Sequence, residues 1–230
     1  MCKMMMLLVA GAVAALAFTA LPSAAAAKET KLRCEGQGIC TFTVNGGVAR
    51  FSIVGGDTVA CTNVEGNGEV TGLNAEQRES TTSTVQLRFL GCREQDTGFG
   101  FSCQNTATPE VITTNLMTMH TIALSVGLKA GVLATSAGVT FTCAGGFAAT
   151  QLTGSLIGEY GAECNTNTWS VQEITFVTTG DGAQSLTSYT GSTFRLEGRA
   201  SHSSGGSYAS AALSGKSSLS FNQSVILTCS

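Results

Sequence analysis

The chain has 230 residues and a net charge of −3, and only 12% of its residues are charged. Because it contains no run of basic residues, the sequence argues against a nucleic-acid partner. Glycine occurs 28 times and proline only twice, and segments with the residue mixture of stable helices are rare. Threonine, valine, isoleucine and phenylalanine at alternating positions instead predict a protein made almost entirely of β-strands.

Residues 1–27 have the features of a secretory signal peptide. A lysine precedes a long apolar run, a proline ends the run, and small residues follow up to Ala27. We therefore expect an exported β domain at 28–230 and a secreted or envelope-associated protein. A membrane anchor is the alternative, because an apolar run of roughly 17 residues is at the lower limit for a membrane span.

Nine cysteines occur, and one of them, Cys2, belongs to the predicted signal peptide. An even number of remaining cysteines in an exported chain indicates disulfide bonds. A zinc site is the competing interpretation, but closely spaced C-x₂₋₄-C pairs are lacking after residue 27. The disulfide candidates are Cys34, Cys40, Cys61, Cys92, Cys103, Cys143, Cys164 and Cys229.

In the first half of the exported domain, short β-type segments alternate with glycine-containing turns. The triplet Asn45-Gly46-Gly47 predicts a hairpin turn between two strands, and a second turn is expected at Gly66-Asn67-Gly68. Val85, Leu87 and Phe89 share one face of a clear strand. The expected strands are 40–44, 48–54, 58–62, 69–73 and 83–90.

The second half contains the longest apolar stretch of the exported domain, 111–135, with strict alternation between residues 121 and 129. Further strands are expected at 139–143, 169–178, 194–200 and 219–229. We therefore expect an all-β fold, an antiparallel β-sandwich or Greek-key barrel stapled by disulfides. A boundary between two β halves is possible near 105–109, where a proline interrupts the pattern.

A weak internal similarity suggests one disulfide pairing. Segments 41–47 and 140–146 share T-F-T followed by a glycine pair, and Cys40 and Cys61 have the same spacing as Cys143 and Cys164. Other pairings remain open, because eight cysteines allow roughly a hundred of them. The similarity suggests Cys40–Cys61, Cys92–Cys103 and Cys143–Cys164, with Cys34–Cys229 joining the two ends.

Several segments resemble exported β-rich proteins of actinobacteria. They are Ile112-Thr-Thr-Asn-Leu116, Val126-Gly-Leu128, Thr140-Phe-Thr-Cys143-Ala-Gly145 and Leu152-Thr-Gly-Ser-Leu-Ile-Gly158, together with 68–72 and 85–92. The resemblance implies export and a β fold, and it assigns no catalytic or binding residue.

The two histidines do not form a recognisable catalytic or metal pattern. His120 precedes Ile122 and Leu124 on the same side of an alternating strand, so we expect it to face inward with a hydrogen-bonding partner. His202 lies in a serine- and glycine-rich stretch and is expected to be solvated. No metal or cofactor is predicted.

Other patterns that could indicate catalysis are incomplete. The segment 205–209 approaches a serine-hydrolase elbow but lacks its final glycine, and Gly215-Lys216-Ser217 lacks the remainder of a phosphate-binding loop. Trp169, at a strand start, is expected in the core. Three carboxylate pairs lie in loop-like stretches and are interpreted as solvated charges rather than sugar-hydrolysing pairs: Glu76 with Glu79, Glu94 with Asp96, and Glu159 with Glu163.

The sequence therefore predicts an exported, non-enzymatic structural or binding protein of the cell envelope or extracellular space. Its partner is expected there and is not identified by the sequence. A secreted hydrolase is the first alternative, and a pore-forming or outer-membrane β-barrel is the second. No residue is assigned to catalysis, cofactor binding or metal binding.

Overall fold

The computed structural model describes residues 30–54, 56, 58–73, 76, 78–96, 98–124, 129–135, 138–145, 149–165, 168–179, 183–189, 192–193, 195–200 and 208–229. The predicted signal peptide, His202 and residues 205–207 of the hydrolase-like segment 205–209 lie outside these residues. No helix occurs in the described part of the chain. Accordingly, none of its segments is a helix long and apolar enough to cross a membrane.

The described chain forms short and long β-strands. Their bounds are β1 Thr30–Cys34, β2 Thr41–Ile53, β3 Thr58–Cys61, β4 Asn63–Thr71, β5 Glu79–Ser80, β6 Thr82–Leu90, β7 Arg93–Glu94, β8 Cys103–Gln104, β9 Val111–Thr113, β10 Met117–Ala123, β11 Lys129–Thr135, β12 Val139–Cys143, β13 Thr150–Gly154, β14 Leu156–Glu163, β15 Trp169–Phe176, β16 Ser188–Tyr189, β17 Ser192–Thr193, β18 Leu196–Ala200 and β19 Ala209–Cys229.

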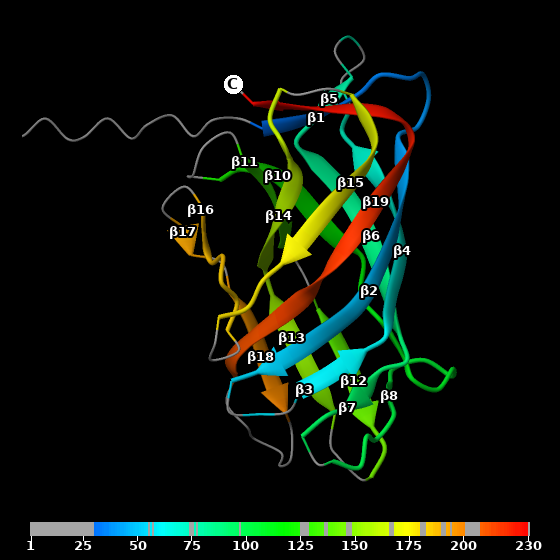
Figure 1. The fold of residues 1–230 in the computed structure, drawn as a ribbon, viewed down its shortest axis with the longest axis vertical. Coiled ribbons are helices and arrows are strands. Elements are labelled where there is room, and N and C mark those ends of the chain that lie inside the picture. Colours follow the sequence, from blue (N-terminus) through cyan, green and yellow to red (C-terminus); the bar gives the residue numbers. More distant parts are fainter. Residues whose placement is uncertain are drawn as a thin grey trace, which may run out of the picture.

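The strands close into one antiparallel barrel (Figure 1). Among the described residues, eight wall positions follow one another in chain order: β2, β3 with β4, β6 with β7, β9 with β10, β11 with β12, β13 with β14, β15 with β18, and β19. The last position, β19, pairs with the first, β2, and this pairing closes the ring. Strands on both sides of residues 105–109 thus belong to the same barrel.

This architecture confirms the predicted all-β, antiparallel, disulfide-linked fold, and of the two expected forms it is a barrel and not a sandwich. Its connections differ from the expected Greek key. Successive wall positions pair with each other, so the connections are up-and-down; a Greek key would instead return a fourth strand beside the first. Strand β19 is the longest, with 21 residues, and it pairs with β1, β2, β15 and β18. Strand β19 therefore connects β1, the first wall position β2, and both strands of the seventh wall position, β15 and β18.

In strand β6, apolar side chains point into the barrel and polar ones point outward. In β6, Val85 and Phe89 are buried, whereas Gln86 is exposed on the opposite face, as the alternation predicted. Within the interior, the ring of Phe51 packs against Phe89 at 4.6 Å and against Phe141 at 6.2 Å between centroids. These three rings come from three different wall positions and join them across the interior.

Glycine triplets that were predicted to be turns lie inside strands. Residues 45–47 belong to β2 and residues 66–68 to β4. The register of β2 with β19 shifts near Gly46, which is typical of a β-bulge. A Cβ added to Gly68 would contact the ring of Phe42 and lie 2.6 Å from the Thr84 carbonyl oxygen. Gly46, Gly66 and Gly68 therefore serve close packing within the wall, whereas an added Cβ at Gly47 would meet no atom within 4 Å.

All eight candidate cysteines form disulfides, but the pairing suggested by the internal similarity is wrong. Each cysteine bonds to its neighbour in the sequence of cysteines. The reason is spatial: Cys103 and Cys143, for example, are direct register partners of β8 and β12. Equal spacing along the chain does not report which strands are adjacent in a barrel. The bonds are Cys34–Cys40, Cys61–Cys92, Cys103–Cys143 and Cys164–Cys229.

Candidate functional site

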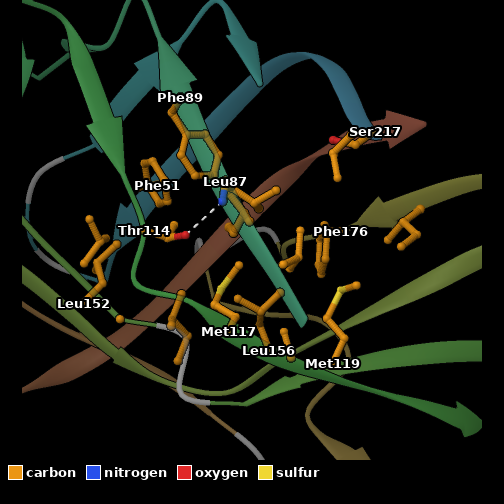
Figure 2. A pocket seen from close by; sticks show the side chains of 18 of the residues that line it. Phe51, Leu87, Phe89, Thr114, Met117, Met119, Leu152, Leu156, Phe176 and Ser217 are labelled. Carbon is orange, nitrogen blue, oxygen red and sulfur yellow. Dashed lines mark hydrogen bonds between the residues drawn. The ribbon is translucent and has the colours of Figure 1, made fainter. Parts of the chain in front are cut away.

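The barrel encloses an apolar cavity of about 60 Å³ (Figure 2). Its described lining comes from seven of the eight wall positions, all except β3 with β4, because inward-facing positions of every second residue converge on the same space. Figure 2 shows these side chains directed toward one another from opposite walls. The lining includes Phe51, Leu87, Met117, Met119, Leu156 and Phe176.

Aromatic rings occupy the barrel on both sides of the cavity along its axis. Phe51 and Phe89 both line the cavity and belong to the ring cluster described above. In the other direction, Val44 and Leu219 line the cavity, and the next inward positions are Phe42 and Phe221. These two rings lie 5.2 Å apart between centroids. The cavity is therefore a space in the middle of a packed interior, between two aromatic layers.

Trp169 extends the second of these layers. Its ring is 5.6 Å from that of Phe221 between centroids, and it packs against the main core. The expectation that this residue belongs to the core is confirmed. A tryptophan in this position adds rigid apolar area to one end of the interior.

Two lining residues with polar side chains are described, Thr114 and Ser217, and the hydroxyl of Thr114 is already used by the wall. The hydroxyl of Thr114 accepts a hydrogen bond from the backbone N–H of Leu87 at 3.1 Å. The backbone N–H of Thr114 donates to the Leu87 carbonyl at 2.9 Å. Among the described lining residues, none has a titratable side chain. The cavity can therefore exclude water and contact an apolar group, and its lining offers no acid or base for chemistry.

Two methionines form the adaptable part of the lining. Met117 and Met119 occupy alternate positions of β10 and both point into the cavity (Figure 2). Methionine is unbranched and has three rotatable side-chain bonds, so it fits irregular spaces and can move aside. The sequence contains six methionines, and the other four lie in the predicted signal peptide. These two are consequently the only methionines of residues 28–230.

His120 lies on the outer face of β10, so its predicted inward orientation is wrong. Because Met117, Met119 and Thr121 face inward, alternation directs His120 and Ile122 outward. His120 is half-buried there. The sequence misled because Ile122 is also buried: with Leu133 and Ile157 it forms a small outer cluster on which Leu186 packs. Where both faces of a strand are covered, apolar alternation does not identify the interior.

Of the first two carboxylate pairs, Glu76 is exposed as expected, whereas the other three side chains have partners in the fold. Glu79 forms an ion pair with Lys31 at 3.8 Å. Glu94 is only 3% exposed, so the expectation that it is solvated is wrong. It accepts a hydrogen bond from the backbone N–H of Asp96, which in turn accepts one from that of Thr58. This pair ties a turn to β3.

The remaining charged candidates lie on strands. Glu159 and Glu163 belong to β14 and not to a loop, which corrects the prediction. Residues 215–217 belong to β19, where Lys216 pairs with Glu173 at 2.7 Å. Within the described ranges, no group of three or more His, Cys, Asp or Glu side chains could hold a metal ion.

The fold and cavity together define a disulfide-linked, up-and-down β-barrel with an apolar interior. Comparisons of the chain with protein-family models, curated proteins and solved structures gave no match.

Proposed function

We propose that this chain is an exported, non-enzymatic binding protein whose barrel interior holds a small apolar group. The observation that carries the proposal is the cavity lined by apolar side chains in the centre of the barrel. Eight-stranded barrels are just wide enough either to be filled by side chains or to hold one small ligand. Here the filling is incomplete.

Energetics favour a small occupant. An empty cavity destabilises a protein by about 24 cal/mol per Å³, so 60 Å³ corresponds to about 1.4 kcal/mol. A ligand that fills the cavity restores van der Waals contacts, and the free energy that they contribute is of this magnitude. An engineered apolar cavity of about 150 Å³ binds benzene or xenon. The smaller cavity suits an atom or a short hydrocarbon group, and a longer group requires Met117 and Met119 to move.

Other features support the location and the class. Four disulfides are typical of proteins in an oxidising, extracellular environment, which agrees with export. The apolar side chains face inward, whereas a membrane barrel places its apolar band outward. This orientation favours a binding protein over the pore-forming alternative.

The test uses the two cavity methionines as reporters. In the exported domain, beginning at residue 28 and labelled with ¹³C-methyl methionine, only Met117 and Met119 give signals. Titration with n-pentane should shift both signals in a saturable way, because the probe enters the space that they line. The measurement is a series of two-dimensional methyl NMR spectra.

A cavity-filling variant provides the control. Ala134 lines the cavity from β11, and Ala134→Val adds two methyl groups there while keeping a residue suited to a strand. This variant should lose the pentane-induced shifts. Ala60→Val, at a half-buried position of β3, should keep them. The proposal fails if pentane leaves both signals of the unmodified protein unchanged, or if Ala134→Val responds as the unmodified protein does.

A further inference from the structure

Two open hollows lie on the outer face of the barrel, separate from the interior cavity. One has a volume of about 550 Å³ and is lined by residues of β2, β4 and β6 together with Leu116. The other has a volume of about 530 Å³ and is lined by residues of β2, β4, β15 and β19. These strands are neighbours in one part of the wall (Figure 1). The hollows adjoin at Asn45, which lines both, and together they form what we call the outer groove.

Polar side chains of adjacent strands line the outer groove in two rows. The members of a row are register partners, and neighbouring strands lie about 4.7–4.9 Å apart. The first row consists of Thr43, Asn67 and Gln86. The second row consists of Glu173, Ser218, Asn45, Glu65 and Arg88. The outer groove therefore offers amide and hydroxyl groups at regular intervals across the strands.

The charges of the outer groove are balanced. Arg88 pairs with Glu65 at 2.6 Å, and Lys216 pairs with Glu173 at 2.7 Å. Each charged side chain of the described lining thus has a partner of opposite sign within the groove. Because a strongly charged ligand is attracted by a surface of the opposite net charge, this lining favours an uncharged one.

The amides of the outer groove are not used by the fold. Asn45 and Asn67 are exposed, and within the described part of the chain neither side chain makes a hydrogen bond. Asparagine and glycine are both disfavoured in strands, yet they make up 45–47 and 66–68. Close packing explains three of the four glycines, but not the two asparagines or Gly47. Residues that oppose the local structure without a packing reason are expected at functional sites.

The hydrogen-bonding groups of the outer groove fit a polyhydroxyl compound. An asparagine side chain both donates and accepts, and so does each hydroxyl of a sugar. Gln86 Nε2 donates to the Thr114 carbonyl at 3.1 Å, which orients this amide and leaves its Oε1 as an acceptor. Leu116 and Val48, 64% and 58% exposed, line the two hollows and can contact the C–H groups of a sugar ring. An extended peptide would instead require pockets for its alternate side chains.

We propose that the outer groove binds a neutral oligosaccharide. The sugar chain crosses the strands between Leu116 and Val48, and the side chains of Asn45 and Asn67 bind its hydroxyl groups. This site is separate from the barrel interior, so the inference does not rest on the proposed function.

The test uses the ¹⁵N-labelled domain 28–230 and three neutral probes, cellohexaose, maltohexaose and chitohexaose. At least one of them should shift the side-chain amide signals of Asn45 and Asn67 in NMR spectra in a saturable way. Asn45→Ala and Asn67→Ala should each weaken its binding at least threefold, because a neutral hydrogen bond contributes modestly to affinity. Gln95→Ala removes an exposed amide outside the groove and should leave the affinity unchanged.

Several results would overturn the inference. It is wrong if none of the three probes shifts these amide signals, or if both asparagine variants bind as the unmodified protein does. It is also wrong if a glycine–serine peptide shifts the signals and the sugars do not. Tighter binding of hexagalacturonate than of all three neutral chains would contradict the uncharged class. The response of Met117 and Met119 to pentane tests the interior separately, so either proposal can fail alone.

Discussion

Removing the disulfides one at a time should lower the free energy of unfolding in the order of the chain segments that they close. The bonds join consecutive cysteines, so no loop contains another bond and each contribution can be treated independently. In the chain-entropy relation, a bond constrains the unfolded chain more when its loop is longer.

The relation gives a ranked series. The bond Cys34–Cys40, with a sequence separation of 6, should contribute about 2.2 kcal/mol. The bond Cys61–Cys92, with a separation of 31, should contribute about 3.7 kcal/mol. The bond Cys103–Cys143, with a separation of 40, should contribute about 3.9 kcal/mol. The bond Cys164–Cys229, with a separation of 65, should contribute about 4.3 kcal/mol.

Paired Cys→Ala variants measured by urea unfolding give these values as differences from the unmodified domain. Peptide mapping of the unreduced protein by mass spectrometry checks the pairing itself. The reasoning is refuted if the Cys34/Cys40 variant loses as much stability as the Cys164/Cys229 variant. It is equally refuted if the map shows Cys40 joined to Cys61.

Two further perturbations test the packing of the interior. Burial raises the pKa of Tyr160 well above its usual value, although a hydrogen bond with the Thr121 side chain acts in the opposite direction. Above pH of about 10 the unfolded chain loses this proton and the folded one keeps it, so stability should fall by up to about 1.4 kcal/mol per pH unit. Tyr160→Phe should remove this part of the pH dependence in urea unfolding, and Tyr208→Phe, at an exposed site, should not. Gly68→Ala, crowded by neighbouring groups, should cost about 1–3 kcal/mol. Gly47→Ala, with no atom within 4 Å of the added Cβ, should change stability by less than about 0.5 kcal/mol; equal losses would contradict the close packing.

The all-β class could be predicted because alternation is a local property. Val85 and Phe89 face inward simply because strand residues alternate between two faces. The disulfide state could also be predicted, since it depends on cysteine number and cellular compartment. Both conclusions require no knowledge of which strands are neighbours.

The remaining features depend on such neighbours. In the sequence, Gly68 resembles a turn residue. Its actual role, close packing against the ring of Phe42, depends on an adjacent strand. His120 shares its strand face with Ile122, and the packing of Leu124 and Leu186 on the outer cluster explains why that face is apolar. The cavity is lined by described residues of seven of the eight wall positions, so no contiguous segment carries a signal for it.

Crystals of the domain 28–230 held under xenon pressure test the central claim most directly. Xenon scatters strongly and binds in dry apolar cavities. The structure predicts one buried xenon atom among Met117, Met119 and Leu156, and its absence in crystals of Ala134→Val. Xenon found only on the surface, or not at all, would contradict an interior that binds apolar groups.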